Sequence, residues 1–475
     1  MKLVTALLLL VLFPYLSGSG QISNPRHPAE WEEVSGVVMG FRYFKNPNLS
    51  WDEAFAPFVK VAQACIDEGI DFYVLALSEE QSRNPFPVSL DTVFSNRNII
   101  SPFVHIIKID SLSSTLPWVR DHGMNQVYQN DIGQGYLLNF PDDHTGKFMA
   151  GYLDIPEIEI QTGIKAQYFT DGGNFLTDGH GTFNIATSCT TDTTGCLPTG
   201  VLDEFDYFQS HLGIRQTLNL SSSFVHVDYF LKLINEETAL VAYIPNNNYD
   251  ISIDEFYDDQ YYIDQAVISI SQQLKSVYGR EIKFIPIQNA PTTYDKITGI
   301  VLHTSKATYI NSLILNQTVL VPQYGIEPFD GLALKTYQSA MPGYKIVGVD
   351  CRQYAHLYGA VHCLTHEIYA ANPIYVKHKW YQGIVDNKPD GYPVQVTAKS
   401  ADGIRQATLH WRTGKKDRFT LQPMVEKQTD LFETLIPKVN SGTAIEYFIE
   451  IENNNGKLLQ KPPFAPLNAY QFTIQ

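Results

Sequence analysis

Short apolar runs recur along residues 25–379, separated by stretches long enough for a helix or a long loop. Runs of this kind, bounded by polar or turn residues, are typical of buried strands. Helical patterns lie between several of them, and strands that alternate with helices indicate the α/β class. We therefore predict an α/β architecture with strands at residues 36–40, 72–77, 106–109, 238–243, 284–287, 318–322 and 345–349.

The pattern changes at about residue 384, where apolar and polar residues begin to alternate with a period of two. This alternation is typical of half-buried antiparallel strands. It predicts a small β-sandwich at residues 386–475, after a larger α/β domain at residues 25–382. The predicted strands of the sandwich are residues 392–397, 406–412, 431–437, 444–451 and 469–474.

The first 20 residues have the layout of a secretory signal peptide. Lys2 is followed by an apolar run and then by small residues at positions 17–20. The run is too short to cross a bilayer, so we expect no membrane span. We therefore expect an exported chain, in the periplasm, on the cell surface or outside the cell.

Composition and charge narrow the classes of partner. Hydrophobic residues make up 44% and charged residues 18% of the chain, which excludes intrinsic disorder. The 50 Asp and Glu against 34 Lys and Arg give a formal charge of −16, which repels phosphate backbones. No nucleic-acid partner is therefore expected. The acidic excess would draw in a cationic substrate, or it serves solubility alone.

The five cysteines are an odd number for an exported protein, so at least one is free or bonded to another chain. Cys189 and Cys196 flank a turn-rich segment that could close a short disulfide loop. Cys65 falls in a helix predicted at residues 51–68, where a buried thiol is inert, and Cys351 is interpreted in the same way. Cys363 is the candidate for chemistry.

Four segments place polar residues among apolar ones. Burying a charge in such surroundings is costly unless the charge is paired or has a function. In the segment at residues 223–230, period-2 spacing would put His226 and Asp228 on one face of an extended segment. In the segment at residues 359–368, His362 and His366 stand at helical i,i+4 spacing. The segments are residues 117–123, 171–182, 223–230 and 359–368.

Three interpretations of these segments remain open. The first is a metal site with His226, Asp228, His362 and His366 as ligands, although no HExxH or paired-cysteine pattern is present. The second is structural and makes the histidines ordinary core groups. It also pairs the Asp and Arg of residues 117–123 with each other.

The third interpretation is nucleophilic catalysis by Cys363. It assigns acid and base work to His226 and makes Asp121 and Asp228 the acceptors for a cation. This interpretation uses the thiol and the acidic residues together.

Taken in order, the motifs resemble those of one family, the agmatine deiminases and Porphyromonas-type peptidylarginine deiminases, which modify guanidino groups. The resemblance implies a pseudo-symmetric five-bladed α/β propeller with the site on its central axis. The C-terminal sandwich resembles the immunoglobulin-like module of secreted members. The motifs are Pro28-Ala-Glu-Trp-Glu32, Trp118-Val-Arg-Asp-His-Gly123, Asp171-Gly-Gly-Asn174, His226-Val-Asp228, Tyr309-Ile-Asn-Ser312, Pro322-Gln-Tyr-Gly325, Val349-Asp-Cys-Arg352 and Gly359-Ala-Val-His-Cys-Leu-Thr365.

The resemblance also implies a reaction, in which a guanidinium is hydrolysed to a ureido group and ammonia without a metal or other cofactor. Cys363 would be the nucleophile, His226 the acid and base, and Asp121 and Asp228 the holders of the guanidinium. Lesser roles are implied for the residues that would bind the substrate. Trp118 would cover the apolar stem of the substrate, Asn311 would hydrogen-bond near Cys363, and Asp171, Gly172 and Gly173 would shape the wall of the site, with Arg120 also placed among these residues. His362 would point away from the site if its segment is extended, and it is interpreted as structural.

The substrate class follows less directly. Export and the sandwich favour arginine in peptides or proteins, converted to citrulline. The alternative is agmatine, converted to N-carbamoylputrescine for polyamine synthesis. Between His122 and Ile214 the chain has no Arg to bind a C-terminal carboxylate, which favours an internal arginine or an amine. An amidinotransferase or a non-catalytic exported binding protein also remains open.

Overall fold

The structure is a computed structural model of the chain. Statements about it concern the described residues only. The predicted signal peptide at residues 1–20, Asp171 and Cys196 lie outside them, as does the side chain of Cys189, so the candidate disulfide does too. The described residues are 22–41, 51–77, 90–109, 117–139, 144–159, 172–189, 212–222, 224, 226–244, 259–295, 300–302, 304, 306–355, 357 and 359–475.

Five small sheets share one pairing plan in the described part of residues 22–369. In each, an antiparallel pair is followed by a strand parallel to its second member, and one sheet has a further parallel strand. The predicted strands all fall in these sheets, which confirms the α/β class. The sheets are β4 (Asn125–Tyr128), β5 (Gly135–Asn139) and β6 (Glu157–Glu159); β7 (Leu176–Thr177), β8 (Asn184–Cys189) and β9 (Thr217–Ser222); β10 (Leu231–Asn235), β11 (Thr238–Tyr243) and β12 (Lys283–Gln288); β15 (Leu313–Leu315), β16 (Thr318–Gln323) and β17 (Lys345–Asp350); and β18 (Thr365–Tyr369), β1 (Val34–Phe41), β2 (Asp71–Leu77) and β3 (Val104–Ile109).

The sheet that contains β1 joins distant parts of the sequence. β18 runs antiparallel to β1, with Val38 opposite His366. The segment that carries Cys363 therefore leads directly into a strand held by the N-terminal part of the chain. A separate hairpin pairs β13 (Thr293–Asp295) with β14 (Ile300–Leu302).

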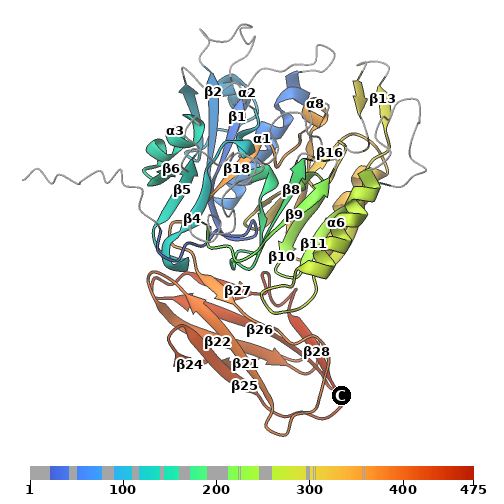
Figure 1. Cartoon of the computed structure of the whole chain (residues 1–475). Coiled ribbons are helices and arrows are strands. Elements are labelled where there is room, and N and C mark those ends of the chain that lie inside the picture. Colours follow the sequence, from blue (N-terminus) through green and yellow to red (C-terminus); the bar gives the residue numbers. More distant parts are fainter. Residues whose placement is uncertain are drawn as a thin grey trace, which may run out of the picture.

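Helices lie outside these sheets, with α3 and α6 on opposite sides of the α/β part (Figure 1). The predicted helix at residues 51–68 is confirmed, and Cys65 is fully buried in it. The helices are α1 (Trp51–Glu68), α2 (Leu90–Ser95), α3 (His144–Leu153), α6 (Asp259–Gln273), α7 (Phe329–Ala340) and α8 (Arg352–Ala355), with short 3-10 turns η1 (Val119–Asp121), η2 (Gln129–Asp131), η3 (Gly172–Asn174) and η4 (Val227–Tyr229).

The C-terminal part is built from strands alone (Figure 1). Its two sheets share one hydrophobic core, in which Val394 of one sheet and Leu409 and Ile449 of the other are fully or almost fully buried. The five predicted strands are confirmed; β19, β20, β23, β24 and β27 are additional. The sheets are β19 (Tyr375–Lys377), β21 (Tyr392–Lys399), β25 (Leu431–Ile436) and β24 (Val425–Gln428); and β20 (Gly383–Val385), β28 (Tyr470–Ile474), β26 (Ala444–Asn453), β22 (Ile404–Arg412) and β23 (Thr420–Pro423), with β27 (Leu458–Lys461) beside β26.

Ion pairs join the two parts. Lys461 of β27 pairs with Glu236, which is 2% exposed. Burial opposes ionisation of Glu236, but Lys461 and His180 outweigh it and hold the pKa of this carboxyl below its usual value. At the other end of the junction, Lys399 pairs with Asp131 at 2.8 Å. Charges from the C-terminal part therefore neutralise charges of the α/β part.

Among the described residues, none of the helices is both long and apolar enough to cross a membrane.

Candidate active site

The candidate catalytic residues come from separate segments of the α/β part that meet around Cys363. The turn η3 contacts both η1 and η4, and η1 also contacts β18. Cys363 lies in the turn that precedes β18 and is 4% exposed. The arrangement explains why residues far apart in sequence can act on one group.

Asn311 and Asp228 are the immediate polar neighbours of the thiol. Nδ2 of Asn311 donates to Sγ of Cys363 at 3.1 Å and to Oδ2 of Asp228 at 2.9 Å. Sγ of Cys363 lies 3.5 Å from the same Oδ2. The contact between Asn311 and Cys363 is the one that the family resemblance implies.

The other end of the Asn311 amide fixes the backbone of the nucleophile. Its Oδ1 accepts the backbone N–H of His362 at 3.1 Å and that of Cys363 at 3.3 Å. Asn311 is 1% exposed, so water does not compete for these groups. One side chain therefore positions the thiol, its backbone and a carboxylate.

Asp121 and His226 form the more open side of the site. Nδ1 of His226 lies 3.9 Å from Oδ1 of Asp121, and their side chains are 12% and 29% exposed. Gly173 packs against both, because a Cβ at this position would stand 2.7 Å from Nδ1 of His226 and 3.4 Å from Oδ1 of Asp121. The resemblance assigns Gly173 to the wall of the site, and only glycine fits there without displacing His226.

Arg120 points away from this opening and supports the loop of the nucleophile. It is 4% exposed, its Nε donates to the carbonyl of His362 at 3.1 Å, and its Nη1 pairs with Glu367 at 2.7 Å. Gly172 leaves room for it, since a Cβ there would be 2.7 Å from Cδ of Arg120. These contacts favour a supporting role over direct substrate binding. They also show that Arg120 does not depend on Asp121 for its charge partner.

Trp118 packs on the backbone that leads to the nucleophile. A Cβ on Gly359 would fall 2.2 Å from the Trp118 ring, so glycine is required for this approach. The indole is half-buried and packs edge-on against the Tyr354 ring, with 6.4 Å between the ring centroids. Trp118 therefore packs beside the site, where it could also cover the apolar stem of a substrate.

The electrostatics of the site suppress the thiolate. Burial raises the pKa of the Cys363 thiol well above its usual value, and the carboxylates of Asp228 and Asp121 raise it further, while Asn311 opposes them. Oδ1 of Asp228 is buried and has no hydrogen-bond partner among the described residues. The site thus offers a carboxylate oxygen to a donor and needs positive charge to ionise its thiol.

Two local predictions were wrong. His226 is extended, but Val227–Tyr229 is a 3-10 turn, so the period-2 argument for His226 and Asp228 does not describe their geometry. His362 and His366 do not lie on a helix, because a turn gives way to β18 between them. In both places tertiary packing overrides the local spacing.

Sequence reasoning also missed a layer of charged residues behind Cys363. Glu30, Lys232 and Glu367 are part of it, and His362, interpreted as directed away from the site, contacts Asp228 at 2.8 Å. A lysine inside the apolar run of residues 231–235 was a usable signal, because a lysine is almost never fully buried unless it is paired.

Comparison with known proteins agrees with this site. The sequence profile of the Porphyromonas-type peptidyl-arginine deiminase family matches residues 26–368, which include the candidate site residues described above. The chain belongs to this family. It is therefore an enzyme of the guanidino deiminase class, whose members hydrolyse C–N bonds of amidines.

Individual relatives carry agmatine deiminase names. A Legionella pneumophila protein named "Putative agmatine deiminase" is 25% identical over 277 residues, which cover 55% of this chain and 75% of that protein. A Marinomonas protein of the same name is 23% identical and covers 74% of this chain and 96% of its own length. The solved agmatine deiminase of Enterococcus faecalis has a TM-score of 0.57 at 20% identity, covering 74% of this chain and 98% of its own. The structural likeness supports the fold of this deiminase.

Proposed function

We propose that this deiminase is exported and converts the guanidinium of arginine residues in peptides or proteins to citrulline, with Cys363 as nucleophile. The observation that carries the reaction is the meeting of Cys363, Asn311 and Asp228 beside Asp121 and His226. The substrate preference and the export are supported by the signal-like N-terminus and the appended β-rich part.

The acidic groups suit a planar cation. A guanidinium presents several N–H donors in one plane, and carboxylates hold it through charge-assisted hydrogen bonds. Among the described residues, Oδ1 of Asp228 has no hydrogen-bond partner, and Asp121, whose side chain is 29% exposed, lies on the more open side of the site. Because these carboxylates raise the pKa of Cys363, a bound guanidinium that neutralises them would lower it again. Substrate binding would therefore generate the thiolate.

The covalent steps then follow from the geometry. The Cys363 thiol gives its proton to His226, and the resulting thiolate attacks the central guanidinium carbon and forms a tetrahedral adduct. His226 donates a proton to the departing nitrogen, so that the C–N bond breaks and ammonia leaves an S-alkylthiouronium group on Cys363. His226 next removes a proton from water, whose oxygen attacks the same carbon. The C–S bond breaks, the ureido product leaves and the thiolate is restored.

The architecture is proposed to be the five-bladed α/β propeller of this family. Support comes from the five sheets that share one pairing plan and from the meeting of η1, η3 and η4 at the site. The C-terminal part is proposed to be an immunoglobulin-like β-sandwich domain, supported by two sheets around one core. Its strands β19 and β20 begin before residue 386.

Agmatine is the second candidate substrate, because the relatives described above carry agmatine deiminase names. Agmatine offers the same guanidinium on a short aliphatic stem that ends in an amine. The acidic balance of the chain suits this dication as well as a basic peptide.

The test measures ammonia and ureido product from purified mature protein with four substrates: agmatine, free arginine, an internal-arginine peptide and a C-terminal-arginine peptide. We expect turnover by the wild type, fastest on the internal-arginine peptide, and none by Cys363→Ala. Faster turnover of agmatine would reverse the order of the two substrates. No turnover of any of the four would refute the deiminase proposal and leave amidino transfer or a binding role, and transfer to an added amine would then be assayed.

A further inference from the structure

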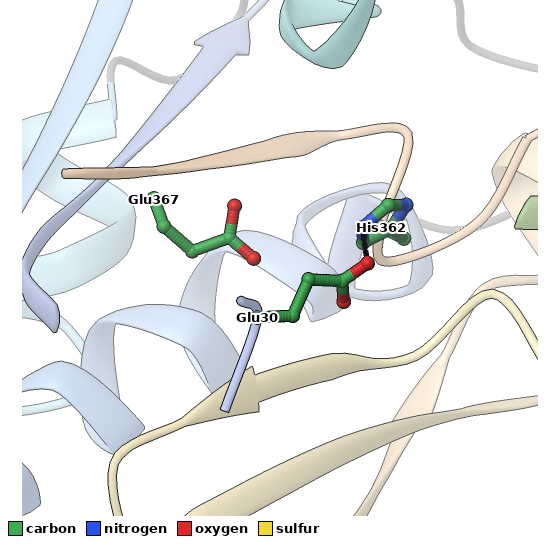
Figure 2. A group of neighbouring side chains, drawn as sticks. All are labelled: Glu30, His362 and Glu367. Carbon is green, nitrogen blue, oxygen red and sulfur yellow. Dashed lines mark ion pairs between the residues drawn. The ribbon is translucent and has the colours of Figure 1, made fainter. Parts of the chain in front are cut away.

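A buried group of charged side chains lies behind Cys363, on the side away from the Asp121 opening. Glu30 comes from the segment before β1, His362 from the turn before β18 and Glu367 from β18 itself (Figure 2). Their side chains are 15%, 1% and 0% exposed. Nothing in the proposed chemical steps uses this group.

Both ring nitrogens of His362 face a carboxylate. Nδ1 is hydrogen-bonded to Oδ2 of Asp228 at 2.8 Å. Nε2 lies 3.3 Å from Oε1 of Glu30, an ion-pair distance that does not meet hydrogen-bond geometry among the described residues (Figure 2 marks this pair). A neutral imidazole carries one N–H, so one of its nitrogens would direct a lone pair at a carboxylate oxygen. Only the imidazolium presents a proton to both neighbours.

The charges around the ring agree with an imidazolium. Glu30 also pairs with Lys232, and Arg120 pairs with Glu367 at 2.7 Å. Burial would raise the pKa of Glu30, but Lys232, His362 and Arg120 together hold it below its usual value. With His362 protonated, the three carboxylates among these described residues are balanced by three cations. Among the described residues, the titratable groups that face His362 and its partners are Cys363 on the same turn, Asp228 of η4, Lys232 of β10, Arg120 of η1, His366, Glu367 and Tyr369 of β18, and Tyr337 of α7.

The other buried histidine nearby does not share this charge. Burial, followed by the positive charge of Arg120, lowers the pKa of His366 to about 3. His366 is therefore neutral at physiological pH. Of these two buried histidines, only His362 has both ring nitrogens next to a carboxylate.

A cation site is the competing use of the same residues. One donor atom from each of Glu30, His362 and Glu367 lies within 4.8 Å of the others. However, Lys232 and Arg120 already neutralise the two carboxylates. A divalent ion there would meet two fixed cations without water to screen them, which disfavours its binding.

We propose that His362 is a positioning residue, held as an imidazolium between Glu30 and Asp228. It orients the Asp228 carboxylate and places a fixed positive charge next to the Cys363 thiol. The part that concerns Asp228 as a holder of guanidinium rests on the proposed function. The part that concerns the thiol does not depend on any substrate.

The first experiment measures alkylation of Cys363 by iodoacetamide across pH, with the modified site identified by mass spectrometry. His362→Asn keeps a donor near the Nδ1 position but removes the charge, and Glu30→Gln removes the carboxylate that requires the second proton. We expect both variants to be alkylated about tenfold more slowly near neutral pH, a shift of about one pH unit in the profile. The matched control is His378→Asn, because His378 is also a buried histidine, hydrogen-bonded instead to Tyr447 and Gln395 in the C-terminal part.

The second experiment observes the ring directly. In protein labelled with ¹⁵N-histidine, the signals lost in His362→Asn should be those of a doubly protonated ring at pH 7, and Glu30→Gln should convert them to those of a neutral ring. Elemental analysis should find the same metal content in the wild type and in His362→Asn, with no stoichiometric metal lost in the variant. A neutral ring in the wild type, a metal lost with His362, or wild-type alkylation in both variants would each overturn the proposal.

Turnover separates this proposal from the proposed function. If the wild type is active, we expect KM for the guanidino substrate to rise about tenfold in His362→Asn. The fall in kcat should be smaller once the lower thiolate fraction of Cys363 in the variant is taken into account. If no substrate turns over but the alkylation and ring signals behave as expected, the deiminase proposal fails and the imidazolium stands. If turnover is found and the ring is neutral, the reverse holds.

Discussion

Replacing Asn311 by alanine removes a side chain that contacts Cys363, Asp228 and the backbone of the nucleophile together. Hydrogen bonds to charged groups contribute about 1.5–3 kcal/mol, and one pKa unit corresponds to about 1.4 kcal/mol. Losing the donor at 3.1 Å from Sγ should therefore raise the pKa of the thiol by about one to two units, since Asn311 lowers it in the wild type. Because that pKa already lies above neutrality, the thiolate fraction at pH 7 should fall about tenfold to a hundredfold.

The same substitution affects stability by a smaller amount. The backbone N–H of His362 keeps a second acceptor, the Asn311 carbonyl at 3.2 Å, whereas that of Cys363 loses its side-chain acceptor. One buried donor left without a partner costs about 1–3 kcal/mol. We expect Asn311→Ala to fold, with its free energy of unfolding reduced by this amount.

Three measurements test this reasoning: the pH profile of Cys363 alkylation, kcat/KM at neutral pH, and urea unfolding. Asn453→Ala is the matched control. Asn453 is also 1% exposed, and its Oδ1 also accepts two backbone N–H groups, at 3.1 and 2.9 Å, but it lies in the C-terminal part. The control should lose similar stability and keep the wild-type thiol profile. An unchanged alkylation profile in a folded Asn311→Ala protein would refute the role of Asn311 as the donor that lowers the pKa of the Cys363 thiol.

Two further substitutions test the packing of the site and the junction between the parts. Gly173→Ala should reduce kcat/KM by more than tenfold in steady-state assays with little loss in Tm, because its Cβ would displace His226; Gly151→Ala, which meets nothing within 4 Å, should leave turnover unchanged. Lys461→Met should lower the free energy of unfolding at pH 7 by about 3 kcal/mol, the lower end of the range for a broken buried ion pair, because it removes the ammonium partner of the Glu236 carboxylate but leaves His180 at 3.4 Å. The pKa of Glu236 is depressed in the folded protein, so its contribution is present above the usual carboxyl pKa and is lost as pH falls through the folded value. Urea unfolding of Lys461→Met and wild type at pH 7 and pH 3 should therefore show a smaller difference at pH 3, and an equal difference would contradict the linkage.

Much of the fold could be predicted because strand and helix periodicity are local properties. The apolar runs at residues 72–77 and 318–322 became strands within one residue of the predicted bounds, and the helix at residues 51–68 was found as predicted. Short or polar strands such as β24 were missed, because all of its residues are exposed and no apolar face marks it. What periodicity cannot supply is the pairing between strands far apart in sequence, such as β1 with β18.

The candidate site was predictable as a set of residues but not as a geometry. Side-chain chemistry made Cys363, Asp228 and Asp121 candidates, because burying charged groups among apolar residues is costly, but it left a metal site and a structural role open. The family resemblance then favoured nucleophilic catalysis. The layer of charged residues behind Cys363 was missed because these residues stabilise one another in pairs. Neither Glu30 nor Lys232 has an evident role until the fold brings the two into contact.

Under the proposed function, the same carboxylates would both select the substrate and suppress the nucleophile. Asp228 and Asp121 would hold the guanidinium, and their negative charges raise the pKa of the Cys363 thiol in the absence of a cation. A thiol is far less reactive toward oxidants and alkylating agents than a thiolate, so the nucleophile is protected until a cation arrives. The proposed positive charge of His362 would then determine how far the pKa of the Cys363 thiol must still fall when the guanidinium binds. Selectivity for a cation and activation of the thiol are, on this argument, two consequences of one arrangement of charge.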